Sequence, residues 1–268
     1  MTQAFHQWLT KWKKNLAEAK EGYHYALSWA KKNGLSGILR FIARDFFGGR
    51  SLFEWLYLIA LCSVPIILEL TLDTKHHDWL GLVSSFAGIL CVILVGEGRY
   101  SNYLIGTISN TTYLYICLTR PEGAFYGEVM TTLYFIIMQP IGLFAWITAS
   151  RKKNAEQDFS VRSLSLQGWL RYILLTVATW GLMGLAYKSI HSARPFRDSI
   201  TDGTNVTGQA LQTESYWEQW LFWIATNVFS IYLWWGSNIH MQGMYWVYLI
   251  NSLYGWYTWM KEAKKSHA

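Results

Sequence analysis

The chain has 268 residues, of which 17% are aromatic and only 15% charged, and this composition excludes an ordinary soluble domain. Its net charge of +6 could suggest nucleic acid, but the basic residues cluster at the N-terminus and in one loop. That distribution is typical of a membrane protein with a fixed orientation. We therefore expect a lipid bilayer around the chain and no nucleic-acid partner.

Residues 1–50 hold nine Lys or Arg against three acids, with aromatic residues spaced among them. A basic segment with this spacing is typical of helices that lie on an anionic membrane surface. The alternative is a solvated tail with some helix. The first apolar run begins near Leu52, and we expect no cleavable signal peptide before it.

Helices that span a membrane need about 20 mostly apolar residues. The sequence offers seven candidates, at 52–72, 79–96, 101–118, 125–149, 168–187, 217–236 and 241–260. The segment 198–214 is too polar for any hydropathy criterion, but two arguments make it an eighth helix buried among the others. The expected fold is an all-α integral membrane protein with about eight transmembrane helices.

The first argument is the distribution of charge. The N-terminal segment, the loop 150–168 and the tail 261–268 are all basic and should lie in the cytoplasm. Four spans separate the N-terminal segment from the loop, so both lie on the same side of the membrane. The tail lies on that side too only if an even number of spans follows the loop. Residues 198–214 must then cross, and both termini are cytoplasmic. Three cations on the outer side, Lys188, Arg194 and Arg197, count against this arrangement.

The second argument is an internal repeat, because two spacings occur in both halves of the chain. They are found at Asn102/Asn110 and Gln219/Asn227, eight residues apart, and at Gly142/Trp146 and Gly255/Trp259, four apart. Placing 101–149 over 218–260 makes 79–96 the partner of 198–214. Three helices in each half with 168–187 between them form a 3+1+3 core of seven, and the odd linking helix makes the two repeats parallel.

These arguments divide the chain into six parts. They are a basic amphipathic cytoplasmic segment (1–50), an extra N-terminal transmembrane helix (51–78), the first three-helix repeat (79–150), a cytoplasmic loop with the linking helix (151–192), the second three-helix repeat (193–260) and a cytoplasmic tail (261–268).

Four stretches carry a family resemblance. They are Gly-Arg-Tyr-Ser-Asn-Tyr-Leu-Ile-Gly at 98–106, Leu-Tyr-Phe-Ile-Ile-Met-Gln-Pro-Ile-Gly at 133–142, Glu-Gln-Trp-Leu-Phe-Trp-Ile at 218–224 and Asn-Ser-Leu-Tyr-Gly-Trp-Tyr-Thr-Trp at 251–259. With them, residues 79–260 resemble the PnuC family of nicotinamide riboside transporters. The polar segment 198–214 departs from the family, which is usually more apolar there.

The resemblance implies a seven-helix core related to the SWEET sugar transporters. It also implies uptake of nicotinamide riboside, a vitamin B3 and NAD precursor, across a bacterial inner membrane by facilitated diffusion with alternating access. A cytoplasmic nicotinamide riboside kinase would trap the substrate, and trimers are expected. Relatives in the family carry thiamine or riboflavin, which remain alternative substrates.

Amide side chains within apolar helices are the first candidates for binding the substrate. Gln139 precedes Pro140, which frees a backbone carbonyl and can bend the helix toward a cavity. The resemblance marks this position. Asn110, Asn227 and Asn251 are further candidates, with Asn227 and Asn251 expected to hold ribose hydroxyls. For all four the alternative is a hydrogen bond between helices, worth about 0.6 kcal/mol in a bilayer.

The polar segment supplies Asp202 and Gln209. A buried carboxylate is costly in a membrane and usually functional, and Asp202 could balance the pyridinium charge of the substrate. Thr201, Asn205 and Gln209 share one helix face that we expect to line the pathway. Asp198 is more simply interpreted as a helix cap.

Aromatic residues are the third group, because half of the 16 Trp lie between Trp217 and Trp259. The expected stacking residues for the nicotinamide ring are Trp223, Tyr254, Trp256 and Trp259, together with Trp180 in the linking helix. The usual alternative is an aromatic belt at the membrane surface. We assign that role to Trp79, Trp146, Trp169, Trp217 and Trp234.

Catalysis, cofactors and metals are not expected. The histidines His76, His77 and His240 have no ligand spacing, and the three cysteines lie in separate apolar runs. An integral-membrane enzyme and a receptor-like protein are the competing classes. The enzyme lacks a convergent acid–base set, and the receptor would not need buried amides.

Overall fold

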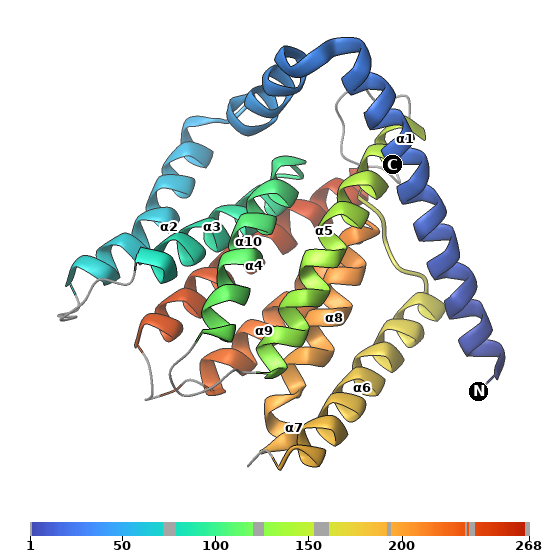
Figure 1. Cartoon of the computed structure of the whole chain (residues 1–268), viewed down its shortest axis with the longest axis vertical. Helices are drawn as coiled ribbons and strands as arrows, with labels where there is room; N and C mark the ends of the chain where they lie inside the picture. The colour runs from blue at the N-terminus through green and yellow to red at the C-terminus, as the bar shows by residue number, and fades with distance from the viewer. Residues whose placement is uncertain are drawn as a thin grey trace.

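The computed structural model describes residues 2–71, 79–119, 126–152, 161–191, 194–233, 235 and 239–265. Within these ranges the chain is helical (Figure 1), and an isolated bridge joins Arg162 to Tyr216. The helices are α1 (Thr2–Phe47), α2 (Leu52–Thr71), α3 (Trp79–Gly96), α4 (Ser101–Leu118), α5 (Tyr126–Lys152), α6 (Leu166–Ser189), α7 (Pro195–Asp198), α8 (Ile200–Thr213), α9 (Gln219–Leu233) and α10 (Ile239–Lys265). The expectation of an all-helical fold is confirmed.

The helices lie within a few residues of the predicted ones, and this includes the polar segment. Its first residues form the separate turn α7, and α8 begins only at Ile200. By length and apolar composition, four helices of the described part could cross a membrane: α2, α3, the Glu128–Arg151 stretch of α5, and α6. The predicted extra N-terminal span, α2, is one of them.

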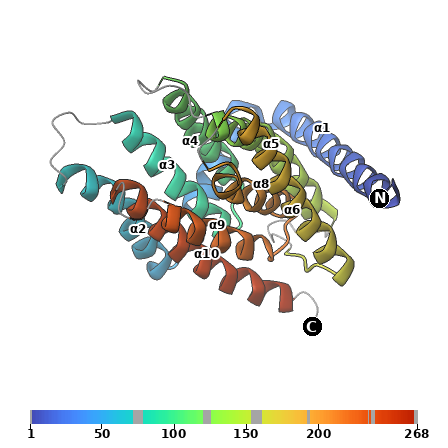
Figure 2. The ribbon, with the colours of Figure 1, turned by 90° about the horizontal axis from the view of Figure 1, so that it is seen from below.

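Two three-helix bundles form the centre of the molecule. Helices α3, α4 and α5 pack together, as do α8, α9 and α10. The third helix of each bundle packs on the first helix of the other, because α5 contacts α8 and α10 contacts α3. Helix α6 lies on α8, and α2 lies on α3 and α10. Figure 2 shows α2 and the N-terminal half of α1 on opposite sides of these bundles.

Hydrogen bonds explain why a helix as polar as α8 lies buried between the bundles. Each neighbouring helix offers a hydroxyl to one of its polar side chains, so these polar atoms are satisfied without water, whereas Gln209 Nε2 has no partner in the described structure. The pairs are Asp202 with Thr131 of α5 (2.7 Å) and Tyr187 of α6 (2.6 Å), Thr207 with Thr176 of α6 (2.7 Å), and Thr204 with Thr226 of α9 (2.7 Å).

Helix α1 forms an arch over one end of the bundles (Figure 1). Its two limbs meet at Gly34, whose φ of 64° is readily adopted only without a side chain. The first limb crosses the last turns of α5, where Thr148 Oγ1 donates to the Glu18 carbonyl at 2.8 Å. Asn15 Nδ2 donates to Glu214 Oε1 at 2.9 Å, just beyond α8. This packing argues against a solvated tail, whereas a place on the membrane surface stays a prediction.

Corresponding close approaches occur in the two bundles at the repeated glycines. A Cβ at Gly142 of α5 would collide with the ring of Tyr103 on α4. A Cβ at Gly255 of α10 would collide with the ring of Trp220 on α9. Tyr103 directly follows Asn102, and Trp220 directly follows Gln219, so both rings stand at matching positions of the repeat.

The two repeated tryptophans also have matching contacts. Trp146 packs edge-on against Tyr103 and Trp259 against Trp220, with ring centroids 5.0 and 5.8 Å apart. Trp146 Nε1 donates to the Gln212 carbonyl of α8 at 2.9 Å, and Trp259 Nε1 to the Gly96 carbonyl of α3 at 3.0 Å. Each indole thus ties its own bundle to the first helix of the other. The assignment of Trp146 to a membrane-surface belt is wrong, because this residue is 1% exposed.

Candidate functional site

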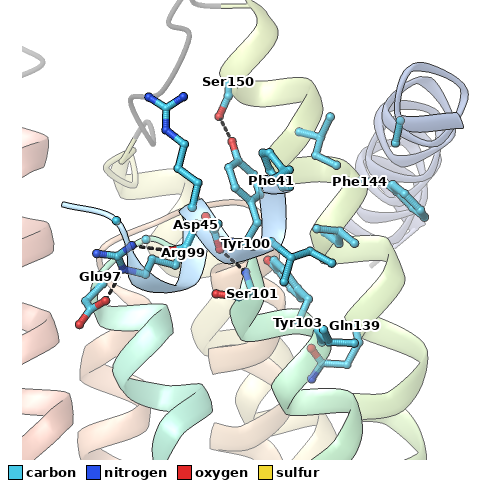
Figure 3. Close-up of a pocket in the computed structure, with 18 of the residues that line it drawn as sticks. Phe41, Asp45, Glu97, Arg99, Tyr100, Ser101, Tyr103, Gln139, Phe144 and Ser150 are labelled. Atoms are coloured by element: carbon cyan, nitrogen blue, oxygen red, sulfur yellow. Dashed lines mark hydrogen bonds and ion pairs between the residues drawn. The ribbon is translucent and has the colours of Figure 1, made fainter. Parts of the chain in front are cut away.

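A cavity of about 1930 Å³ opens beneath the arch, between α1 and the ends of α4, α5 and α10 (Figure 3). Residues of α1, among them Trp29 and Phe41, line its mouth, and Thr258 of α10 lines another wall. Tyr103 and Gln139 line its deeper part, on α4 and α5. The cavity therefore leads from the end of the bundle to the predicted amide on α5.

Gln139 is 5% exposed, and its amide lies against Gly106 of α4. The carbonyl oxygen Oε1 has no hydrogen-bond partner among the described residues. A buried acceptor left in this state costs about 1–3 kcal/mol. A ligand, an ion or an ordered water can complete the bonding of such an atom.

Several other buried polar atoms share this property and come from both bundles. Within the part of the chain described, they include Asn102 Oδ1 and Tyr103 OH on α4, Gln209 Nε2 on α8, Gln219 Nε2 and Trp220 Nε1 on α9, and Trp256 Nε1 on α10. The set offers donors and acceptors to a polar ligand. Of these residues, Gln209 and Trp256 are predicted site residues. Asn102 and Gln219 are predicted only as positions of the repeat, and the spacing that they share with Asn110 and Asn227 was the signal that could have marked them.

An aromatic cluster includes or contacts part of this set. Tyr103, Trp146, Trp220 and Trp259 belong to one buried cluster, and Trp223 and Trp256 pack against it. Trp223 Nε1 donates to Gln219 Oε1 at 3.4 Å, which joins the rings to the amides. The structure thus brings together three predicted stacking residues, Trp223, Trp256 and Trp259, although the indole N–H of Trp259 is committed to Gly96.

The predicted asparagines have partners within the protein. Asn251 Nδ2 donates to the Val92 carbonyl at 2.8 Å, and its Oδ1 accepts from Tyr57 OH at 3.3 Å, so it joins α2, α3 and α10. Asn227 Nδ2 donates to Ser252 Oγ at 3.1 Å. These bonds favour the helix–helix role that was the alternative for both residues. Asn110 is half-buried on α4.

Asp202, Tyr254 and Trp180 lie in different surroundings. Both carboxylate oxygens of Asp202 accept hydroxyl bonds, as described for α8. Tyr254 lines the cavity and packs on Tyr57 with ring centroids 4.7 Å apart. Trp180 is 37% exposed, donates to the Phe196 carbonyl at 2.7 Å, and is not part of the aromatic cluster.

Some predicted positions lie outside the described residues: His76, His77, Trp234, and the side chains of Asp198 and His240. Among the residues that are described, no three His, Cys, Asp or Glu side chains gather as a metal site would require.

Comparison with known proteins identifies the family. Residues 78–261 match the family model described as nicotinamide mononucleotide transporter. The nicotinamide riboside transporter PnuC of Haemophilus influenzae is 33% identical over 84% of this chain and 97% of its own length. The chain belongs to the PnuC family. A second PnuC, from Neisseria mucosa, is 31% identical over 92% of this chain and 90% of its own length.

A crystal structure of a PnuC protein supports the same conclusion for the fold. The structure described as the vitamin B3 transporter PnuC has a TM-score of 0.70 and 30% identity, and covers 85% of this chain and 98% of its own. PnuC relatives are transporters and not enzymes, so the chain is no enzyme and the family resemblance seen in residues 79–260 is confirmed.

Proposed function

We propose that this chain carries nicotinamide riboside across the membrane without changing it. The observation that carries the proposal is the unpaired Oε1 of Gln139, whose side chain lines the cavity together with Tyr103 and Trp259 of the indole cluster. Further unpaired amide nitrogens lie on α8 and α9, at Gln209 and Gln219. Nicotinamide riboside has a carboxamide, ribose hydroxyls and a flat cationic ring. Amides both donate and accept, and a cation over an indole gains about 0.5–2 kcal/mol. The names of the two PnuC relatives support this substrate.

Within this proposal the side chains have different roles. Gln139, Gln209 and Gln219 hydrogen-bond the ligand, because each has an unpaired atom. Trp223 and Trp256 stack on the ring. The remaining predicted residues, Asn110, Asn227, Asn251, Trp180, Asp202, Tyr254 and Trp259, keep their proposed place near the pathway. For Asn251, Asp202 and Trp180 the hydrogen bonds described above favour a supporting role.

We also propose the 3+1+3 architecture with about eight spans, in which α3–α5 and α8–α10 are parallel repeats, α6 links them and α2 is the extra span. The matching contacts of Gly142 with Tyr103 and of Gly255 with Trp220 support it. The reciprocal packing of α5 on α8 and α10 on α3 supports it as well. Alternating access would then be a rocking of the two bundles about the site between them.

The proposed location is a bacterial inner membrane with both termini in the cytoplasm. The orientation rests on the basic N-terminal segment, the loop 150–168 and the tail, which this proposal places in the cytoplasm. By family resemblance we propose a trimer, and a cytoplasmic nicotinamide riboside kinase that traps the substrate. Facilitated diffusion fits Asp202, whose carboxylate is engaged by Thr131 and Tyr187.

Calorimetry on the purified protein in detergent tests the substrate. We expect binding of nicotinamide riboside at micromolar or tighter affinity, which is about −8 kcal/mol or more negative. Thiamine and riboflavin should give no heat under the same conditions. Heat with either of them, and none with nicotinamide riboside, would assign the chain to another substrate.

A further inference from the structure

The second limb of α1 ends on the first turn of α4, in the wall of the cavity. Asp45 accepts the backbone N–H of Tyr100 on Oδ1 at 3.2 Å and that of Ser101 on Oδ2 at 2.7 Å (Figure 3). The next two amides, of Asn102 and Tyr103, are satisfied by backbone carbonyls at 3.2 Å each. The start of an α-helix attracts anions through its free N–H groups and its dipole. Here the chain's own carboxylate occupies that position.

Two guanidinium groups and a second carboxylate lie close to Asp45. Arg50 Nε donates to both oxygens of Glu97 at 2.9 Å, and Arg99 pairs with the same carboxylate and donates to the Asp45 carbonyl. Arg99 thus reaches the backbone of Asp45, and both guanidinium groups pair with Glu97. Among these four side chains, loss of the Asp45 charge would leave two cations, one anion and two free N–H groups.

A second observation marks the same place as a ligand position. The hydroxyl of Ser101 is 7% exposed, lines the cavity, and has no hydrogen-bond partner in the described structure. It adds a third donor beside the two amides that Asp45 holds. In Figure 3 the Asp45–Ser101 contact lies between the labelled residues of the mouth and Tyr103 and Gln139 farther in. Asp45, Ser101 and Gln139 all line the same cavity.

The family model is named after nicotinamide mononucleotide and the relatives after nicotinamide riboside, and these two ligands differ by one phosphate group. That group carries about −1.5 to −2 charges at neutral pH. We propose that Asp45 is a specificity-determining residue, whose carboxylate fills the anion site at the start of α4 and so excludes the phosphorylated nucleoside from the cavity. The inference rests on the proposed function. The unphosphorylated cation meets no such repulsion.

Competition binding tests the proposal, with nicotinamide mononucleotide as the probe displacing labelled nicotinamide riboside from the purified protein. The variants are Asp45→Ala, which opens the site, and Asp45→Asn, which keeps an acceptor oxygen but removes the charge. Glu21→Gln is the matched control, because it removes the same charge from α1 at an exposed site beside Arg151. Wild type and the control should resist the mononucleotide. On both Asp45 variants, the mononucleotide should displace the labelled riboside at concentrations at least about tenfold lower than on wild type. Added salt should reduce this difference.

Two results would overturn the proposal: a wild type that binds the mononucleotide as tightly as the riboside, or Asp45 variants that bind the riboside yet stay as selective as wild type. If Asp45→Ala does not melt cooperatively, Asp45→Asn carries the comparison. A wild type that binds neither ligand refutes the proposed function instead, so the two failures are distinguishable.

Discussion

Replacing Gln139 by Leu separates ligand binding from folding, because its Oε1 atom makes no hydrogen bond to the described protein. Leu removes the amide from the deep end of the cavity without leaving a protein group unpaired at that oxygen. A bound riboside would lose its partner at a buried site, which costs about 1–3 kcal/mol. The expected loss of affinity is roughly five- to 150-fold, with little change in melting temperature.

Calorimetry and thermal melting on the same preparations measure both quantities. Met138→Leu is the control, because Met138 is the buried neighbour on α5 and this swap conserves volume. It should leave both affinity and melting temperature near wild type. If Gln139→Leu binds like wild type but melts earlier, Gln139 holds helices together, and the unpaired oxygen does not mark the substrate site.

Three further outcomes follow from the contacts. Asn251→Leu leaves Tyr57 OH without its acceptor, so the melting temperature should fall while affinity stays within a few fold; normal melting with lost binding would place Asn251 in the site. Gly142→Ala and Gly255→Ala should each lower the free energy of unfolding by about 1–3 kcal/mol, because the added methyl group overpacks the contact with the facing ring. Gly181→Ala is the control, because Gly181 has open space around it. Equal melting temperatures for all three variants would contradict the repeat contacts. Uptake into proteoliposomes should not require a proton or sodium gradient, and gradient-driven accumulation abolished by Asp202→Asn would show that this carboxylate couples transport.

Four of the described helices were predictable from length and apolar composition alone. The polar helix α8 was found by counting charges across the membrane and by the repeat, both independent of hydropathy. What the sequence could not supply was the partner of each polar group. The sequence marks Asp202 as a costly carboxylate, but it does not reveal that Thr131 and Tyr187, which are 71 and 15 residues away, donate to it.

The site was predictable in kind but less so in its members. Amides and indoles in apolar helices indicated a polar ligand, and Gln139 lies where the cavity ends. Helical spacing does not reveal which amides find a hydrogen-bond partner within the protein, so Asn251 and Gln139 looked alike in sequence. The arch of α1 over the cavity depends on a turn at Gly34 and on Asp45 meeting α4, which are tertiary contacts without a local signature.

Uptake of labelled nicotinamide riboside into proteoliposomes tests the central claim most directly. Vesicles that contain the protein should fill until the inner and outer concentrations are equal, and the label should be recovered as unmodified riboside. Filling no faster than protein-free vesicles, or recovery of the label as free nicotinamide, would contradict the account.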